Sequence, residues 1–360
     1  MTTLTQARLA AEPTDPTDSS GPLVASPSLD YAVLKRRVYE AGLLRKQPAY
    51  YALVISANAA MLALCLLLLV VLQNPWLKAL DAAGLGLVSG QLGFQLHDAG
   101  HRQMFEKGWK NNLVALITGD ALLGMSYGWW VMKHNRHHAS PNNLDADPDV
   151  NNLAIAYSRD QALERRGPLR MLAAYQAFLF FPLLFLLGFS MHASSFTHLA
   201  GREARHRWIE LGVLVAHFTV YFGLLFWLLG PWLALLVIVL HKAVGGFYMA
   251  SVFAPNHKGM PTVDATMELD FLRAQVLTAR NVRANPLTDL WYGSLNYQIE
   301  HHLFPAMPRN RLRAAHRIVK EYCAEIGVPY YETSMWRSYR ELLAFLHEVG
   351  RPLRGASASG

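Results

Sequence analysis

Long apolar stretches constrain the fold of this chain more than any other feature. A helix can cross a bilayer when it has about 20 mostly apolar residues. Four stretches meet this requirement: residues 50–72, 76–96, 208–229 and 232–253. Gln73-Asn-Pro separates the first two stretches and Gly230-Pro231 separates the last two, and such residues favour turns. The sequence therefore predicts four transmembrane helices arranged as two hairpins.

Composition and charge also favour a membrane protein. Hydrophobic residues make up 52% of the chain and charged residues only 16%, an unusual balance for a soluble protein. The net charge of +7 is modest and requires no nucleic-acid partner. Basic residues beside apolar spans report topology and contact anionic lipid headgroups. Because residues 35–46 before the first span are rich in Lys and Arg, we expect that side to face the cytosol.

The two ends of the chain differ in composition from the rest. Residues 1–30 are rich in Thr, Pro, Ser and Ala and lack the basic start and apolar core of a signal peptide. They predict a disordered cytosolic tail. Residues 350–360 are rich in Gly, Ala and Ser and predict a flexible C-terminal tail. Residues 31–349 are then expected to form one folded domain.

Three short clusters of histidines lie beside the apolar stretches. They read His97-Asp-Ala-Gly-His101, His134-Asn-Arg-His-His138 and Gln298-Ile-Glu-His301-His302. Spacings of three and four residues place the side chains of each cluster on one face of a helix. Imidazole suits iron, zinc or copper. Seven histidines and a glutamine are too many for one four-coordinate zinc ion, and their number suits two iron ions that leave room for oxygen. The clusters therefore predict a membrane di-iron oxidase.

The position of these clusters also constrains the topology. If His138 and His301 lie on one side of the membrane, the chain between them crosses an even number of times. Three apolar stretches lie there, and 171–189, which contains Gln176 and Pro182, is predicted to lie on the membrane surface. Residues 112–132 must not cross either. The expected fold is all-α and integral to the membrane, with four spans, interfacial helices and a helical cytosolic cap that holds the metals.

The clusters resemble the three histidine boxes of the membrane fatty acid desaturase family: HxxxH, HxxHH and a third box that ends in HH. Because the third box begins with Gln298, it is similar to the QxxHH subgroup of front-end and actinobacterial acyl desaturases. Asn142-Asn-Leu-Asp-Ala-Asp-Pro-Asp149 and Leu303-Phe-Pro-Ala-Met-Pro308 agree with this resemblance, which runs from about residue 50 to 308. A fused cytochrome b5 domain, with its His-Pro-Gly-Gly pattern, is not expected.

The resemblance implies a ligand set and partners. The family uses a further histidine between the last span and the third box, and His257 occupies that place. The expected metal ligands are His97, His101, His134, His137, His138, His257, Gln298, His301 and His302. They would hold two iron ions. Electrons would come from a separate ferredoxin or rubredoxin-like protein and its NAD(P)H-dependent reductase, and the substrates would be O2 and a fatty acyl chain on coenzyme A or a lipid.

Other polar residues are candidates for supporting roles. Carboxylates orient metal-bound imidazoles by accepting a hydrogen bond from the second ring nitrogen. The candidates are Asp98, Asp145, Asp147, Asp149 and Glu300. Asn256 either holds a metal-bound water or caps a helix. Within the apolar spans, His217, His241 and Lys242 either hydrogen-bond between helices or line a substrate tunnel.

The preferred interpretation is an O2-dependent acyl desaturase in a bacterial cytoplasmic membrane, with the site and both termini in the cytosol. A di-iron lipid or alkane hydroxylase has the same metal ligands and differs only in where the substrate sits. An intramembrane zinc hydrolase is disfavoured because the first box lacks the glutamate of HExxH. A non-enzymatic heme or metal-transport protein would carry its histidines within the spans, whereas these lie at one membrane face.

Overall fold

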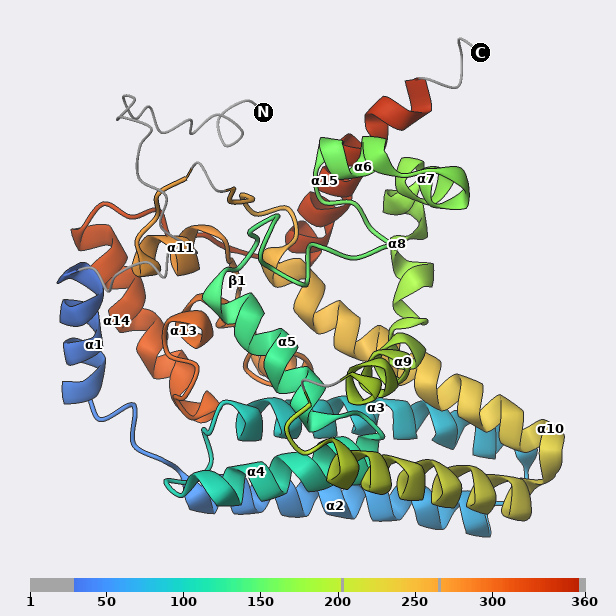
Figure 1. Ribbon diagram of the computed structural model, residues 1–360. Coiled ribbons are helices and arrows are strands. Elements are labelled where there is room, and N and C mark those ends of the chain that lie inside the picture. Colours follow the sequence, from blue (N-terminus) through green and yellow to red (C-terminus); the bar gives the residue numbers. More distant parts are fainter. Residues whose placement is uncertain (1–28, 202–203, 265–266, 356–360) are drawn as a thin grey trace.

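The computed structural model describes residues 29–201, 204–264 and 267–355, which are mostly helical (Figure 1). The first helices are α1 (Leu29–Glu40), α2 (Pro48–Val71), α3 (Pro75–Gly100), α4 (Gly108–Leu116), the π-helix η1 (Ile117–Leu123) and α5 (Tyr127–Ala139). They are followed by α6 (Arg159–Glu164), α7 (Gly167–Ala174), α8 (Gln176–Leu184), α9 (Leu187–Ala200) and α10 (Arg207–His257). The last are α11 (Phe271–Leu277), α12 (Pro286–Trp291), α13 (Gln298–Leu303), the 3-10 helix η2 (Arg309–Arg311), α14 (Leu312–Glu325) and α15 (Met335–Gly355).

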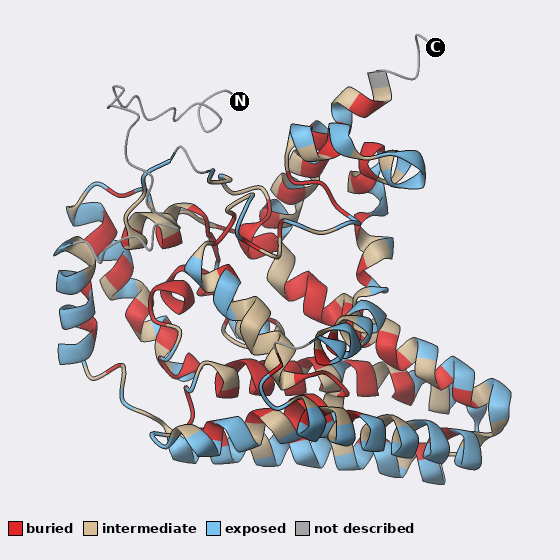
Figure 2. Ribbon diagram, in the orientation of Figure 1, coloured by how far each residue is buried: buried red, intermediate tan, exposed pale blue. Residues whose placement is uncertain are grey.

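The predicted first hairpin is formed by α2 and α3. Asn74 ends the link between them, and its side chain accepts hydrogen bonds from the backbone N–H groups of Trp76 and Leu77. Pro75 occupies the first helical position, where its missing N–H costs nothing. Much of α2 is exposed in Figure 2, although its residues are apolar. An apolar exposed face is what a helix in lipid requires.

The predicted second hairpin is α10, which bends back on itself at Gly230. This residue has φ 69° and ψ 171°, a conformation that favours glycine, and Pro231 can begin a new helix. The two arms of α10, residues 207–229 and 231–257, therefore run in opposite directions without a connecting loop (Figure 1). The second arm packs closely on α3, because a Cβ added to Gly86 would lie 2.9 Å from the carbonyl oxygen of His241.

Not all four predicted spans are equally apolar. By length and composition, α2 and α10 are each suited to cross a membrane. Helix α3 is long enough, but it carries Lys78, Asp81 and Asp98 and is less apolar. The helical architecture is thus confirmed, and the number of spans stays a prediction. No sheet is expected from the sequence, yet the described chain contains a two-stranded parallel one in which β1 (Asn281–Val282) pairs with β2 (Glu332–Thr333).

Two apolar segments were expected not to cross, and neither forms one long straight helix. Residues 171–189 are divided among α7, α8 and α9, and the axes of α7 and α8 differ by 100°. Such a bent pair is either a broken span or a re-entrant loop, so its placement on the membrane surface stays a prediction. Residues 112–132 pass through α4 and η1 and then break at Gly124, where φ is 70°.

The cap is built around a core contributed by α1, α11, α13 and α14, whose buried residues include Leu34, Leu272, Ile299 and Val319. Helix α15 is longer than the sequence suggests: it continues to Gly355 because Val349 and Leu353 pack with Ala173 and Ala174 of α7. The predicted flexible tail is therefore wrong for residues 350–355. Of the predicted N-terminal tail, residues 29–30 begin α1 and the rest lies outside the described residues.

Candidate metal centre

Four helices bring the histidine clusters together. His97 lies in the last turn of α3 and His101 caps its C-terminus. The second box lies on α5, His257 ends α10, and the third box forms α13, which is completely buried. In Figure 1, α5 and α13 lie near one another above the C-terminal end of α3. The box residues other than His101 are thus helical, as their spacing predicts.

The Nε2 atoms of the histidines converge. The Nε2 atom of His301 lies 3.1 Å from those of His97 and His138, and the Nε2 atoms of His134 and His138 are also 3.1 Å apart. The Nε2 atom of His257 lies 3.0 Å from that of His302 and 3.3 Å from that of His137. The side chains form two groups with ligand atoms within 4.8 Å of one another, namely His97, His101, His134 and His301, and His137, His257 and His302.

The neighbours His301 and His302 thus enter different groups, and His138 bridges them. Its Nε2 atom contacts His134 and His301 of the first group, and its ring stacks on that of His302 of the second, with centroids 4.2 Å apart. Two imidazoles bound to one ion at about 2.1 Å lie about 3 Å apart when they subtend a right angle. The observed separations of about 3 Å are therefore compatible with ligands of a bound metal.

The Nδ1 atoms of four of these histidines face hydrogen-bond acceptors. The Nδ1 atom of His137 lies 2.9 Å from Asp147 Oδ2, and that of His97 lies 3.2 Å from Asp98 Oδ1. The Nδ1 atom of His302 lies 2.8 Å from Gln275 Oε1, and that of His257 lies 3.1 Å from the carbonyl oxygen of Thr278. Since these oxygens can only accept, Nδ1 donates in each pair and Nε2 carries the lone pair that could bind a metal.

Burial disfavours the protonated form of several of these histidines. It lowers the pKa of His134, His138, His301 and His302 well below the usual value, and the neighbouring imidazoles lower it further. The Nε2 atom of His101 is buried and has no hydrogen-bond partner among the described residues. An orphaned nitrogen among converging lone pairs is costly unless a cation accepts them. The donor set therefore fits two metal ions that prefer imidazole.

Several predicted supporting residues are placed elsewhere. Asp145 is exposed and does not reach a box histidine. Glu300 accepts hydrogen bonds from Asn281 and Tyr330, at 2.7 and 2.6 Å, and faces away from the histidines. This follows from helix geometry, because a residue two positions after Gln298 lies on the opposite side of α13. Neither carboxylate orients an imidazole, so these two predictions are wrong.

The remaining predicted residues lie at the site with different roles. Asp149 forms an ion pair with Lys133, and its Oδ2 atom is 3.6 Å from His137 Nδ1. Asn256 donates to Gln298 Oε1, at 3.0 Å. The Nε2 atom of Gln298 therefore faces the Nε2 atom of His257, at 2.9 Å, as a hydrogen-bond donor. Direct metal binding by Gln298 stays a prediction.

Gln275 joins two boxes, although the sequence did not identify it as a candidate. Gln275 of α11 is buried; its Oε1 atom accepts from His302, and its Nε2 atom donates to the carbonyl oxygen of His138, at 3.0 Å. Thr278, one turn later, supplies the carbonyl oxygen for His257. Helix α11 carries no histidine and no ligand spacing. The only available signal was a lone glutamine in an otherwise mostly apolar turn.

The amino-acid sequence is similar to those of known proteins. A model of the fatty acid desaturase family matches residues 74–334. An acyl-lipid (9-3)-desaturase of Physcomitrium patens is 32% identical over 89% of this chain, although the chain spans only 62% of that protein. A Delta(8)-fatty-acid desaturase of Euglena gracilis is 31% identical, and a Delta(6)-fatty-acid desaturase of Caenorhabditis elegans 29%; these alignments cover 84% and 90% of this chain and 74% and 76% of those proteins. The match extends across all three boxes and most of the described fold, and the chain therefore belongs to the fatty acid desaturase family.

Proposed function

We propose that this protein introduces a double bond into a fatty acyl chain. The observation that carries the proposal is the convergence of eight histidines in two groups, each able to hold one ion. The overall reaction removes two hydrogens from the chain. Dioxygen is reduced to two waters with those hydrogens, two external electrons and two protons. Two bound iron ions would supply the oxygen activation that side chains alone cannot perform.

The protein's own residues would hold and shield this chemistry. The eight histidines would hold the metals through Nε2, while Asp98, Asp147, Gln275 and the Thr278 carbonyl fix four of the rings through Nδ1. The third box is fully buried, which shields that side of the centre from bulk water. Arg309 lies 3.2 Å from Asp98 and so holds the carboxylate that orients His97.

The partners follow from the reaction. We infer a separate ferredoxin or rubredoxin-like electron donor with an NAD(P)H-dependent reductase. The fatty acyl substrate would be carried by coenzyme A or by a membrane lipid. The basic residues that precede α2 favour a site on the cytosolic face of a membrane, which we propose to be a bacterial cytoplasmic membrane.

Mass spectrometry of acyl chains tests the proposal. Cells that express the protein with a ferredoxin reductase system should contain chains lighter by two hydrogens. His302→Ala should abolish them, whereas His198→Ala, which alters a histidine outside both groups, should not. Chains that gain one oxygen would instead establish a hydroxylase. The purified protein should contain two irons per chain, and one zinc without desaturation would overturn the proposal.

A further inference from the structure

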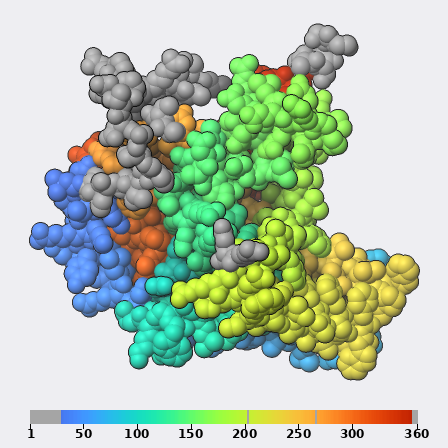
Figure 3. Space-filling model, in the orientation of Figure 1, coloured from blue at the N-terminus to red at the C-terminus, as the bar shows by residue number. Residues whose placement is uncertain are grey.

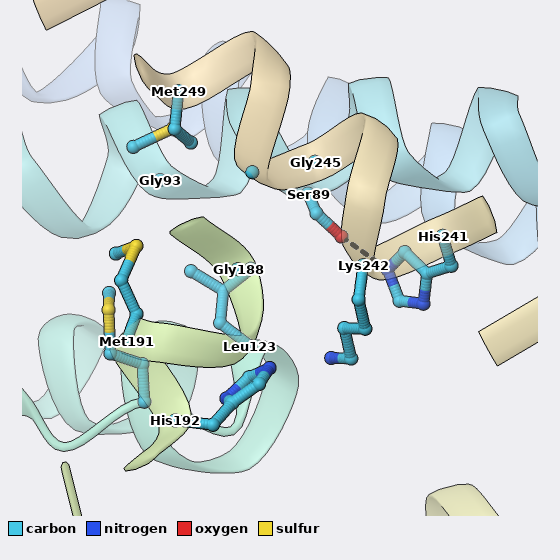
Figure 4. Close-up of a pocket in the computed structure, with 12 residues that line it drawn as sticks. Ser89, Gly93, Leu123, Gly188, Met191, His192, His241, Lys242, Gly245 and Met249 are labelled. Carbon is cyan, nitrogen blue, oxygen red and sulfur yellow. Dashed lines mark hydrogen bonds between the residues drawn. The ribbon is translucent and has the colours of Figure 1, made fainter. Parts of the chain in front are cut away.

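A small apolar cavity lies close to the first histidine box. Its volume is about 60 Å³, and it is bounded by α3, η1, α9 and the second arm of α10 (Figure 4). Gly93 lines it and lies four residues before His97 on the same face of α3, so the two are about 6 Å apart along the helix. The cavity therefore reaches to within one helical turn of the first box.

Met249 occupies the end of the cavity beside Gly93. Its Sδ and Cε atoms lie 2.7 Å from the point where a Cβ of Gly93 would stand. Figure 4 shows the thioether next to this glycine. Methionine is flexible and adapts to the shape of an apolar partner. A slender apolar ligand in the cavity could therefore displace Met249 without moving the backbone.

The polar residues around the cavity are turned toward one another. His241 hydrogen-bonds Ser89 through Nε2 and Tyr221 through Nδ1, each at 2.8 Å. The Lys242 ammonium lies over the Tyr221 ring, 4.8 Å from its centroid. Among the alternatives that the sequence left open for these residues, His241 thus bonds between helices. The surface left to the cavity is mostly apolar and suits a hydrocarbon chain.

A second, open groove adjoins the cavity on the lipid-facing side. Phe189, Ala193 and Phe196 of α9 face Val215, Thr219 and Phe222 of the first arm of α10, each set at helical spacing. The groove has a volume of about 570 Å³. Figure 3 shows α9 and this arm next to each other on the surface. An exposed aromatic groove on an apolar helix opens toward lipid tails.

His192 is the one residue that lines both spaces. Its Nδ1 atom donates to the carbonyl oxygen of Gly124, at 2.8 Å, and its ring meets the edge of Phe218, with centroids 5.3 Å apart. One hydrogen bond and one ring contact therefore separate the groove from the cavity. A rotation of this side chain would join them into a continuous apolar path toward the first box.

We infer that this path is a lateral portal through which the acyl chain of a membrane lipid reaches the metal centre. The inference rests on the proposed desaturase function. The occupant must be apolar, thin and flexible, because the groove is aromatic and the cavity narrow. It must also come from the bilayer, since the groove opens on the membrane-facing arm. A thioester that arrives from the cytosol needs no such opening.

Photolabelling of the whole protein in nanodiscs tests the portal without metal or turnover. The probe is a phosphatidylcholine with a diazirine near the end of one acyl chain. We expect label on the peptide that contains Met125, which lines the cavity and is only 4% exposed. Ala193→Trp and Thr219→Trp fill the groove and should abolish this label. Val220→Trp, on the same arm but outside the groove, should leave it unchanged.

A substitution with the opposite expected effect controls for misfolding. Phe196→Ala widens the groove and should increase the label on the peptide that contains Met125. An unfolded protein would instead take up label on many peptides. Equal labelling of all four variants, or none in the unaltered protein, would overturn the portal. Turnover then separates the two proposals. Loss of lipid-linked desaturation in Ala193→Trp, with acyl-CoA desaturation and iron content retained, supports both. An unaltered protein that takes up label without desaturating overturns the function alone.

Discussion

The carboxylate of Glu210, in the first turns of α10, accepts a hydrogen bond of 2.5 Å from the hydroxyl group of Ser126, the N-cap of α5. The same oxygen accepts from the backbone N–H of Gly128, at 3.0 Å. A negative charge at a helix N-terminus is favourable. Because α5 carries the second histidine box, this contact sets the position of three expected ligands from outside their own helix.

Replacement of Glu210 should therefore loosen the second box. We expect Glu210→Ala to cost about 1–3 kcal/mol of stability, since it leaves buried donors unsatisfied, and to lower the iron content. Glu210→Gln retains an acceptor and should retain much of the stability and of the iron content. Thermal unfolding and elemental analysis of purified protein measure the two effects. Glu164→Ala, which removes an exposed glutamate, is the matched control, and an equal loss in that variant would contradict the assignment.

Asp120 should make stability depend on pH. Burial, together with the nearby Glu210 carboxylate, raises its pKa from 3.8 to about 8. The folded state thus keeps a proton that the unfolded state releases, so the stabilisation is complete below pH 3.8 and is lost as pH rises to about 8. We expect the melting temperature in nanodiscs to fall between pH 5 and 8 for this reason. Asp120→Asn should flatten that fall. If the melting temperature of this variant depended on pH as strongly as that of the unaltered protein, Asp120 would not be its cause.

Two neighbouring aspartates provide a matched pair for the second group of histidines. Asp147 is fully buried and accepts from His137 Nδ1 and from the backbone N–H of Asn142, at 2.9 and 2.8 Å, whereas Asp145 is exposed. Loss of such an orienting carboxylate lowers metal affinity by roughly 10–100-fold. Asp147→Ala should therefore lose iron during dialysis against a chelator, and Asp145→Ala should retain it. Equal retention would show that His137 needs no carboxylate.

Gln275 should couple the second and third boxes. Gln275→Ala removes the acceptor for His302 and the donor to His138, so we expect iron content to fall by a similar factor, roughly 10-fold or more. Gln275→Glu keeps the acceptor for His302 and should preserve more iron than alanine does. The iron content per chain of the two variants, measured after gel filtration, tests this expectation. If both variants bind iron like the unaltered protein, the residue has only a packing role.

The three boxes could be predicted because each lies within one or two helical turns, where spacing alone determines which side chains share a face. The same spacing rule excludes Glu300 from the metal site, because this residue precedes His301 but lies on the other side of α13. Gln275 and the Thr278 carbonyl could not be predicted, because their contacts depend on how α11 packs against α13. The kink at Gly230 was visible as a turn signal, whereas the bend between α7 and α8 depends on tertiary packing.

The division of His301 and His302 between the two histidine groups has a consequence for biosynthesis. Ribosomes make the chain from its N-terminus, so His97 and the second box emerge well before α13. Each group needs one residue of α13, so the first is complete only when residue 301 has been synthesised and the second only when residue 302 has. Both arms of α10 are made by then. We therefore expect metal loading to follow the delivery of the hydrophobic helices to the membrane.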